Sequence, residues 1–233
     1  MPRQVSDGDA PLSGGSGAKQ PVWDLPVRAV HWLLAGLIAF SWWSVHNHHT
    51  NWHIWSGLAI LTLLIFRLLW GFVGSSTARW SSFVRGPASV FAHLRGRWNG
   101  IGHTPLGALS VVAIFFALAV QVGLGLISED EDGLYTGPLY RLVSIDTSDK
   151  ARDNHELWFN LILGLIVLHV AAIIFYRFRG KKLTKPMITG RAILGPGTRP
   201  MRPANWWTAL ICFAIAVGIT RWVIAGAPPL STP

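Results

Sequence analysis

Four histidines of this chain, His31, His53, His155 and His169, lie within or at the edges of strongly apolar stretches. Ionisable side chains at membrane depth are costly, so they are functional candidates by default. Imidazole is a good ligand for transition metals, and two imidazoles on facing helices can bind one haem iron from opposite sides. These residue types therefore indicate haem chemistry inside a helical bundle.

The spacing of the four histidines predicts how they pair. His155 and His169 are 14 residues apart, which is almost four helical turns, or about 21 Å along one face. We expect His155 and His53 where the fourth and second helices begin at the outer membrane surface. We expect His31 where the first helix begins at the inner surface, level with His169. The sequence thus predicts two bis-histidine haems, one bound by His53 and His155 and the other by His31 and His169.

Three further polar residues are candidates for contact with haem carboxylates, and each has an alternative role. Arg67 follows His53 by 14 residues on the same helix face. It fits a haem propionate, but it could equally extend toward the inner lipid headgroups. Arg28, near His31, fits a haem carboxylate or a lipid phosphate. Asn160 fits a propionate or a carbonyl of its own helix.

Other histidines leave alternatives open. His46, His48 and His49 precede His53 in one short stretch. They fit a transition-metal site, a proton relay to a quinone, or an ordinary polar loop, of which the loop is favoured. His93 and His103 compete with His31 as the inner ligand, although neither lies on the first apolar stretch.

The composition sets the class of protein that must position these residues. The chain has 233 residues, of which 51% are hydrophobic and 13% charged, with thirteen Trp. A membrane-spanning helix needs roughly 20 mainly apolar residues. Five stretches come near that length, so we predict an all-α integral membrane protein, a four-helix haem-binding bundle with a fifth C-terminal transmembrane helix. The stretches are residues 29–45, 52–73, 106–127, 157–176 and 206–225.

The positive charge predicts the orientation of the chain in the membrane. The formal net charge is +9, and residues 177–202 contain eight Lys or Arg. The loop over residues 74–104 is also basic, whereas residues 129–132 are all acidic. By the positive-inside rule, the basic segments and the N-terminus are cytoplasmic, and the acidic loop and the C-terminus are periplasmic. Basic residues beside membrane spans argue against nucleic acid as a partner.

The N-terminal residues and the single cysteine limit the other possibilities. Residues 1–21 begin with a polar, Gly- and Ser-rich stretch that lacks the apolar core of a cleavable signal, so we expect a disordered cytoplasmic tail. The one cysteine, Cys212, excludes an intramolecular disulfide, a covalent haem site and a four-Cys iron–sulfur site in this sequence. Any redox centre must be bound by other side chains.

Several motifs resemble the bacterial cytochrome b561 family, which is related to the cytochrome b subunits of nickel–iron hydrogenases and formate dehydrogenases. The resemblance covers residues 22–191. The haem ligands of the family lie in its first, second and fourth helices. The resemblance therefore implies that His31, His53, His155 and His169 are the ligands here. The matching pieces are Val-Trp-Asp-Leu-Pro-Val-Arg-Ala-Val-His-Trp at 22–32, Phe-Arg-Leu-Leu-Trp-Gly-Phe-Val-Gly at 66–74, Phe-Val-Arg-Gly-Pro at 83–87, Gly-His-Thr-Pro-Leu-Gly at 102–107, His-Glu at 155–156, Leu-His-Val at 168–170 and Lys-Pro-Met-Ile-Thr-Gly-Arg at 185–191.

The resemblance implies a function for the chain. Family members exchange electrons with quinones and often with a periplasmic cytochrome c or another redox protein. We therefore expect two haem b groups, a quinone or quinol substrate, membrane lipid around the spans, and electron transfer across a bacterial inner membrane. The chain is then an electron-transfer protein, and the resemblance leaves open whether it is also a quinone oxidoreductase. It is expected to act as a homodimer or as a subunit of a complex.

The sequence also divides the chain and leaves two rival functions. We expect the tail over residues 1–21, a di-haem transmembrane domain over 22–191, and a linker with the fifth helix over 192–233, a helix beyond the usual four. One rival is a membrane-anchor subunit of a hydrogenase-like or formate-dehydrogenase-like complex. The other is a haem-free metal-handling or transport protein that uses the histidines around His46.

Overall fold

The protein is a helical membrane bundle. The structure, a computed structural model, describes residues 19–84, 89, 95, 102, 104–194 and 198–228. Five of its helices are long and apolar enough to cross a membrane, which confirms the predicted all-α membrane class. They are α1 (Leu25–His46), α2 (Thr50–Val73), α5 (Pro105–Ile127), α6 (Ile145–Phe178) and α8 (Trp206–Ile224).

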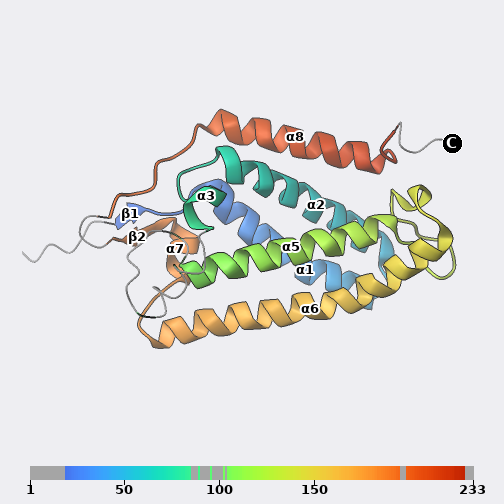
Figure 1. The fold of residues 1–233 in the computed structure, drawn as a ribbon, viewed down its shortest axis with the longest axis horizontal. Coiled ribbons are helices and arrows are strands. Elements are labelled where there is room, and N and C mark those ends of the chain that lie inside the picture. The colour runs from blue at the N-terminus through green and yellow to red at the C-terminus, as the bar shows by residue number, and fades with distance from the viewer. Residues whose placement is uncertain are drawn as a thin grey trace, which may run out of the picture.

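Four of these helices form two packed pairs, and α8 lies outside them. Helix α1 packs on α2, α5 packs on α6, and α2 also contacts α5 and α8. Figure 1 shows α8 running beside α2, on the side away from α6. One buried cluster includes Leu63 and Phe66 of α2 with Cys212 and Ala216 of α8. A second joins the pairs through Ile60, Leu64, Ala117, Leu118 and Ile162.

Two helices begin earlier than hydropathy predicts. Helix α1 starts at Leu25, because Asp24 caps it by accepting a hydrogen bond from the Val27 backbone N–H at 2.7 Å. Helix α6 starts at Ile145, after the N-cap Ser144, because a polar first section can be helical outside the bilayer. His31 therefore lies in the second turn of α1, and His155 lies about three turns into α6 instead of at its start.

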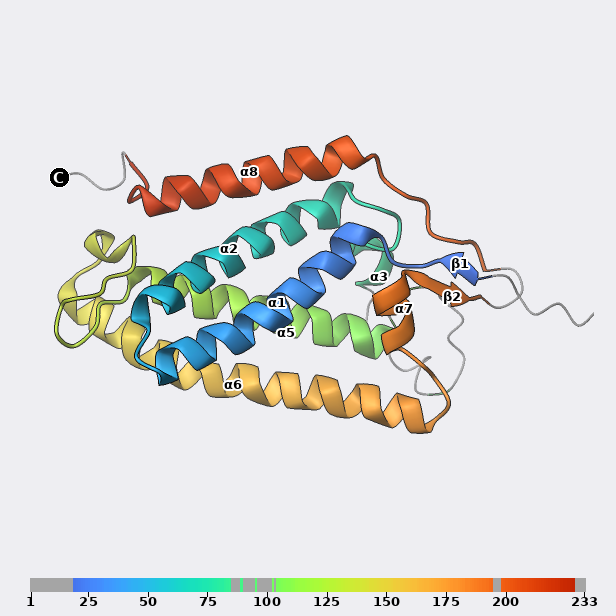
Figure 2. The ribbon, with the colours of Figure 1, turned by 180° about the vertical axis from the view of Figure 1, so that it is seen from behind.

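Short elements gather at one end of the bundle (Figure 2). Strand β1 (Lys19–Pro21) pairs antiparallel with β2 (Arg191–Ile193), with Gln20 opposite Ala192. The predicted tail extended to residue 21, whereas its last three residues form this strand, because β2 supplies their backbone hydrogen bonds. The remaining tail residues lie outside the described residues. Helices α3 (Trp80–Phe83) and α7 (Thr184–Thr189) lie at the same end, and the short η1 (Tyr140–Leu142) lies at the other.

Asp24 joins the N-terminal segment to the end of α2. Its second carboxylate oxygen accepts hydrogen bonds from the Trp70 indole N–H at 2.9 Å and from the Ser75 hydroxyl. Nearby, the Thr77 hydroxyl donates to the Val22 carbonyl at 2.7 Å. Because Trp70 is only 2% exposed, its N–H depends on Asp24. This network fixes the start of α1, and therefore the position of His31.

Candidate functional site

One histidine pair faces across the bundle from α2 and α6. The ring centroids of His53 and His155 lie 5.8 Å apart, with the ring planes nearly perpendicular. The His155 Nδ1 atom is 2.9 Å from the Gln121 backbone carbonyl. A carbonyl only accepts, so Nδ1 carries the proton and Nε2 presents its lone pair. His53 Nδ1 has the Ser41 carbonyl at 3.1 Å and the Ser41 hydroxyl at 3.0 Å.

Of the glycines near this pair, Gly125 gives His155 the room that its ring occupies. A Cβ atom on Gly125 would lie 2.9 Å from Cε1 of His155, so the absence of a side chain lets the imidazole rest against α5. A Cβ on Gly57, one turn after His53, would meet nothing within 4 Å. Gly125 therefore has a role in the position of His155 as well as in the packing of α5 on α6.

The second pair faces across from α1 and α6. The ring centroids of His31 and His169 lie 6.5 Å apart, with a tilt of 50° between the rings. His169 Nδ1 is 3.3 Å from the Ser110 hydroxyl of α5. His31 Nδ1 is buried and has no hydrogen-bond partner in the part of the chain that the structure describes. The structure thus brings the four histidines together in the two combinations that the sequence predicts.

The two candidate arginines have different surroundings. Arg67 is only 6% exposed, and its guanidinium lies over the Trp80 ring at 4.5 Å. Its Nη1 atom is buried and has no hydrogen-bond partner among the described residues. Arg28 instead donates hydrogen bonds to the carbonyls of Ile188 and Asp24. Arg28 therefore connects α1 to α7, whereas Nη1 of Arg67 has no acceptor within the part of the chain that the structure describes.

The remaining candidates are engaged locally. Asn160 donates to the Leu157 carbonyl of its own helix at 3.3 Å. His46 bonds the Trp42 carbonyl, and the His49 ring lies 4.5 Å from the Trp52 ring. No group of three or more His, Cys, Asp or Glu suited to a metal ion occurs among the described residues. His93 and His103 lie outside them.

Sequence reasoning missed the residues that hold the imidazoles. Ser41, Ser110 and Gln121 each contact the Nδ1 atom of one histidine. Gln121 contacts His155 a second time, because its side-chain amide donates to the His155 backbone carbonyl at 3.0 Å. All three are polar residues inside apolar spans, and this is the signal that could have identified them.

Fold and site together define a multi-pass, all-helical membrane protein with paired histidines in its core, which is the architecture of a membrane cytochrome. Residues 22–190 match the family model described as Prokaryotic cytochrome b561. The match covers well over half of the chain, so the protein belongs to this family. It is a membrane b-type cytochrome that binds haem b and transfers electrons. No curated protein and no solved structure matches the chain.

Proposed function

We propose that this cytochrome binds two haem b groups, one between His53 and His155 and one between His31 and His169, and that it carries electrons across the bilayer. The proposal rests on one arrangement. Within each pair the two imidazole rings face each other, and the two pairs lie at different depths of one bundle. The His155–His169 spacing along α6 corresponds to about 21 Å. Each pair is therefore close to a different membrane surface.

The ring separations fit iron ligation. With metal–imidazole bonds of about 2 Å, two imidazoles on opposite sides of one ion have centroids roughly 6 Å apart. The centroid distances of 5.8 Å and 6.5 Å lie on either side of that value. His155 also has the protonation that ligation requires, since its Nδ1 donates to the Gln121 carbonyl and leaves Nε2 free.

Arg67 supports an anionic group near the inner end of the bundle. A buried guanidinium is costly when its Nη1 lacks an acceptor, as here among the described residues, and a haem propionate supplies both the charge and the acceptor. The alternative of extension toward lipid headgroups is disfavoured by its 6% exposure. We assign Arg67 to a propionate of the haem bound by His31 and His169, and we leave Arg28 in its contact with α7.

Haem iron supplies reversible one-electron chemistry. The protein contributes positions and surroundings. When haem is bound, the four histidines would ligate its iron, and Ser41, Ser110 and Gln121 orient three of the four rings. The spans that surround the two pairs are apolar, so they would keep water away from bound haem.

A quinone or quinol is the substrate that we propose at one membrane surface, with a periplasmic cytochrome c or similar redox protein as the other partner. The acidic run over residues 129–132, on the loop at the end of the bundle near His155, favours a basic partner through electrostatic attraction. The basic segments that include α7 lie at the opposite end. This distribution supports a cytoplasmic N-terminus and a periplasmic C-terminus.

Transfer across sealed vesicles tests the proposal. The haem-loaded protein is reconstituted with ferricyanide sealed inside and a membrane-impermeant reductant outside. We expect wild type to reduce the internal ferricyanide, and His53→Ala and His169→Ala each to abolish transfer, because each removes one of two consecutive haems. A haem-loaded wild type that fails to reduce ferricyanide contradicts transmembrane transfer.

A separate mixing experiment with a short-chain quinol tests the substrate. If the quinol is a substrate, the haem absorption must change to its reduced form.

A further inference from the structure

The basic end of α6 carries a cavity that the electron-transfer site does not use. Its volume is about 390 Å³, and it lies between the last turn of α6 and helix α7. Three of its six lining side chains are cations and two carry hydroxyls. The lining residues are Arg177, Lys182, Thr184, Lys185, Ile188 and Thr189.

These cations have no acidic partner within the described chain. The ion pairs of the described residues lie at the far end of α6, between Asp146 and Asp153. No Asp or Glu follows Glu156 in the sequence. At the basic end, Asp24 is occupied by Trp70 and Ser75, while Asp7 and Asp9 lie outside the described residues. Three unpaired cations around one cavity therefore favour an external anion.

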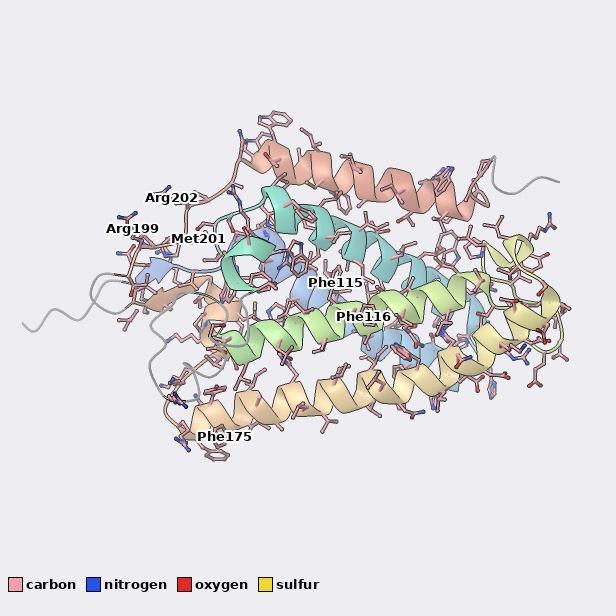
Figure 3. The ribbon with its side chains drawn as sticks, viewed as in Figure 1. Phe115, Phe116, Phe175, Arg199, Met201 and Arg202 are labelled. Carbon is pink, nitrogen blue, oxygen red and sulfur yellow. The ribbon has the colours of Figure 1, made fainter. Side chains whose placement is uncertain are left out.

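The surface of α6 next to the cavity is apolar and continues from Arg177 into the membrane. Ile174, Val170 and Val167 precede Arg177 at intervals of three and four residues, so they form one stripe on the helix. They are 50%, 47% and 61% exposed. Phe175, on the same last turns, projects away from the bundle (Figure 3). A ligand here meets cations at one end and an apolar stripe below them.

We propose that this cavity binds the phosphate group of an anionic phospholipid, with an acyl chain along the Arg177–Val167 stripe. Phosphate oxygens accept several charge-assisted hydrogen bonds at once, which suits a group of Arg and Lys side chains. The stripe accounts for the acyl chain, which free phosphate lacks. The site is independent of the histidine pairs, so it holds whether or not the proposed di-haem function is correct.

Neighbouring cations provide a matched control. Arg179 lies over the Phe175 ring at 5.0 Å and Lys181 over the Tyr176 ring at 5.7 Å. Neither lines the cavity. The double variant Arg179→Gln/Lys181→Gln therefore removes the same charge from the same end of α6 as Lys182→Gln/Lys185→Gln, but leaves the cavity intact.

Native mass spectrometry of lipid binding tests the proposal. The haem-loaded protein in detergent is titrated with phosphatidylglycerol or with phosphatidylcholine of equal chain length. We expect wild type to prefer phosphatidylglycerol. Lys182→Gln/Lys185→Gln should weaken the first bound phosphatidylglycerol about 25-fold, at about five-fold for each lost charge. Arg179→Gln/Lys181→Gln should change it less than two- to three-fold, and Lys182→Arg/Lys185→Arg should retain it.

Three outcomes overturn the proposal. Equal weakening in both Gln double variants means that general surface charge attracts the lipid. Equal affinity of wild type for the two lipids means that the cavity does not recognise an anionic headgroup. Displacement of phosphatidylglycerol by inorganic phosphate at comparable concentration means that free phosphate is the ligand. Haem absorbance reports folding of every variant, so loss of binding in an unfolded protein is recognised.

Discussion

The Nδ1 atom of His155 lies 2.9 Å from the backbone carbonyl oxygen of Gln121, while the Gln121 side chain donates to the His155 carbonyl at 3.0 Å. The Nδ1 contact fixes the rotation of the imidazole and the nitrogen that carries its proton, and the amide contact ties α5 to the backbone of α6. A residue one turn further along α5, Gly125, completes the support, because it leaves space for the ring.

Gly125→Ala should disturb the haem bound by His53 and His155. The new Cβ would lie 2.9 Å from the ring, so His155 must move, at a cost of about 1–3 kcal/mol for overpacking. We expect loss or a spectral shift of one haem and a lower apparent Tm. Gly123→Ala is the control, since its Cβ would meet nothing within 4 Å. Equal effects of the two substitutions would contradict this role of Gly125.

Arg67→Gln should lower the midpoint potential of one haem. A cation close to a haem disfavours the more positive ferric state, so removing it favours oxidation. A tenfold change in the redox equilibrium is about 60 mV for one electron, and we expect a shift of that order in a redox titration. Arg221→Gln, on α8, should leave both potentials unchanged. Unaltered potentials in Arg67→Gln would favour the headgroup interpretation of Arg67.

Asp24→Ala should destabilise the bundle at its basic end. The substitution removes the N-cap of α1 and leaves the buried Trp70 N–H without its acceptor. Together these losses should cost about 2–4 kcal/mol, visible as a lower apparent Tm in haem absorbance. Asp146→Ala removes an exposed ion pair with Lys150 and should change the Tm little. A Tm for Asp24→Ala equal to that of Asp146→Ala would be inconsistent with the network.

A chain that ends at Ala204 should keep its haem. Helix α8 packs on α2 through buried Cys212 and Ala216 and through a hydrogen bond between Thr220 and Thr62. The Nδ1 contacts described above for the histidine pairs come from α1 and α5, not from α8. We expect wild-type haem content with reduced thermal stability, measured on the purified truncated protein. Loss of both haems on truncation would show that α8 is required to assemble the bundle.

The membrane spans were predictable because hydropathy is a local signal, and the five spans are confirmed. The start of α6 was not predicted, because hydropathy ignores the polar turns from Ile145 onward. The N-cap Ser144 is nevertheless visible in the sequence. The pairing of β1 with β2 joins residues far apart in the chain. The same is true of the Gln121 contact to His155. Contacts of this kind join residues far apart in the chain and depend on how the elements pack. A single sequence does not show that packing directly.

The number of haems per chain tests the central proposal most directly. Pyridine-haemochrome analysis measures the haem content of the purified protein, and amino-acid analysis measures the protein concentration. Their ratio should be two haem b per chain. His53→Ala and His169→Ala should each give about one, because each removes a ligand of a different haem. One haem or none in wild type, or an unchanged content in either variant, would contradict the two-pair assignment.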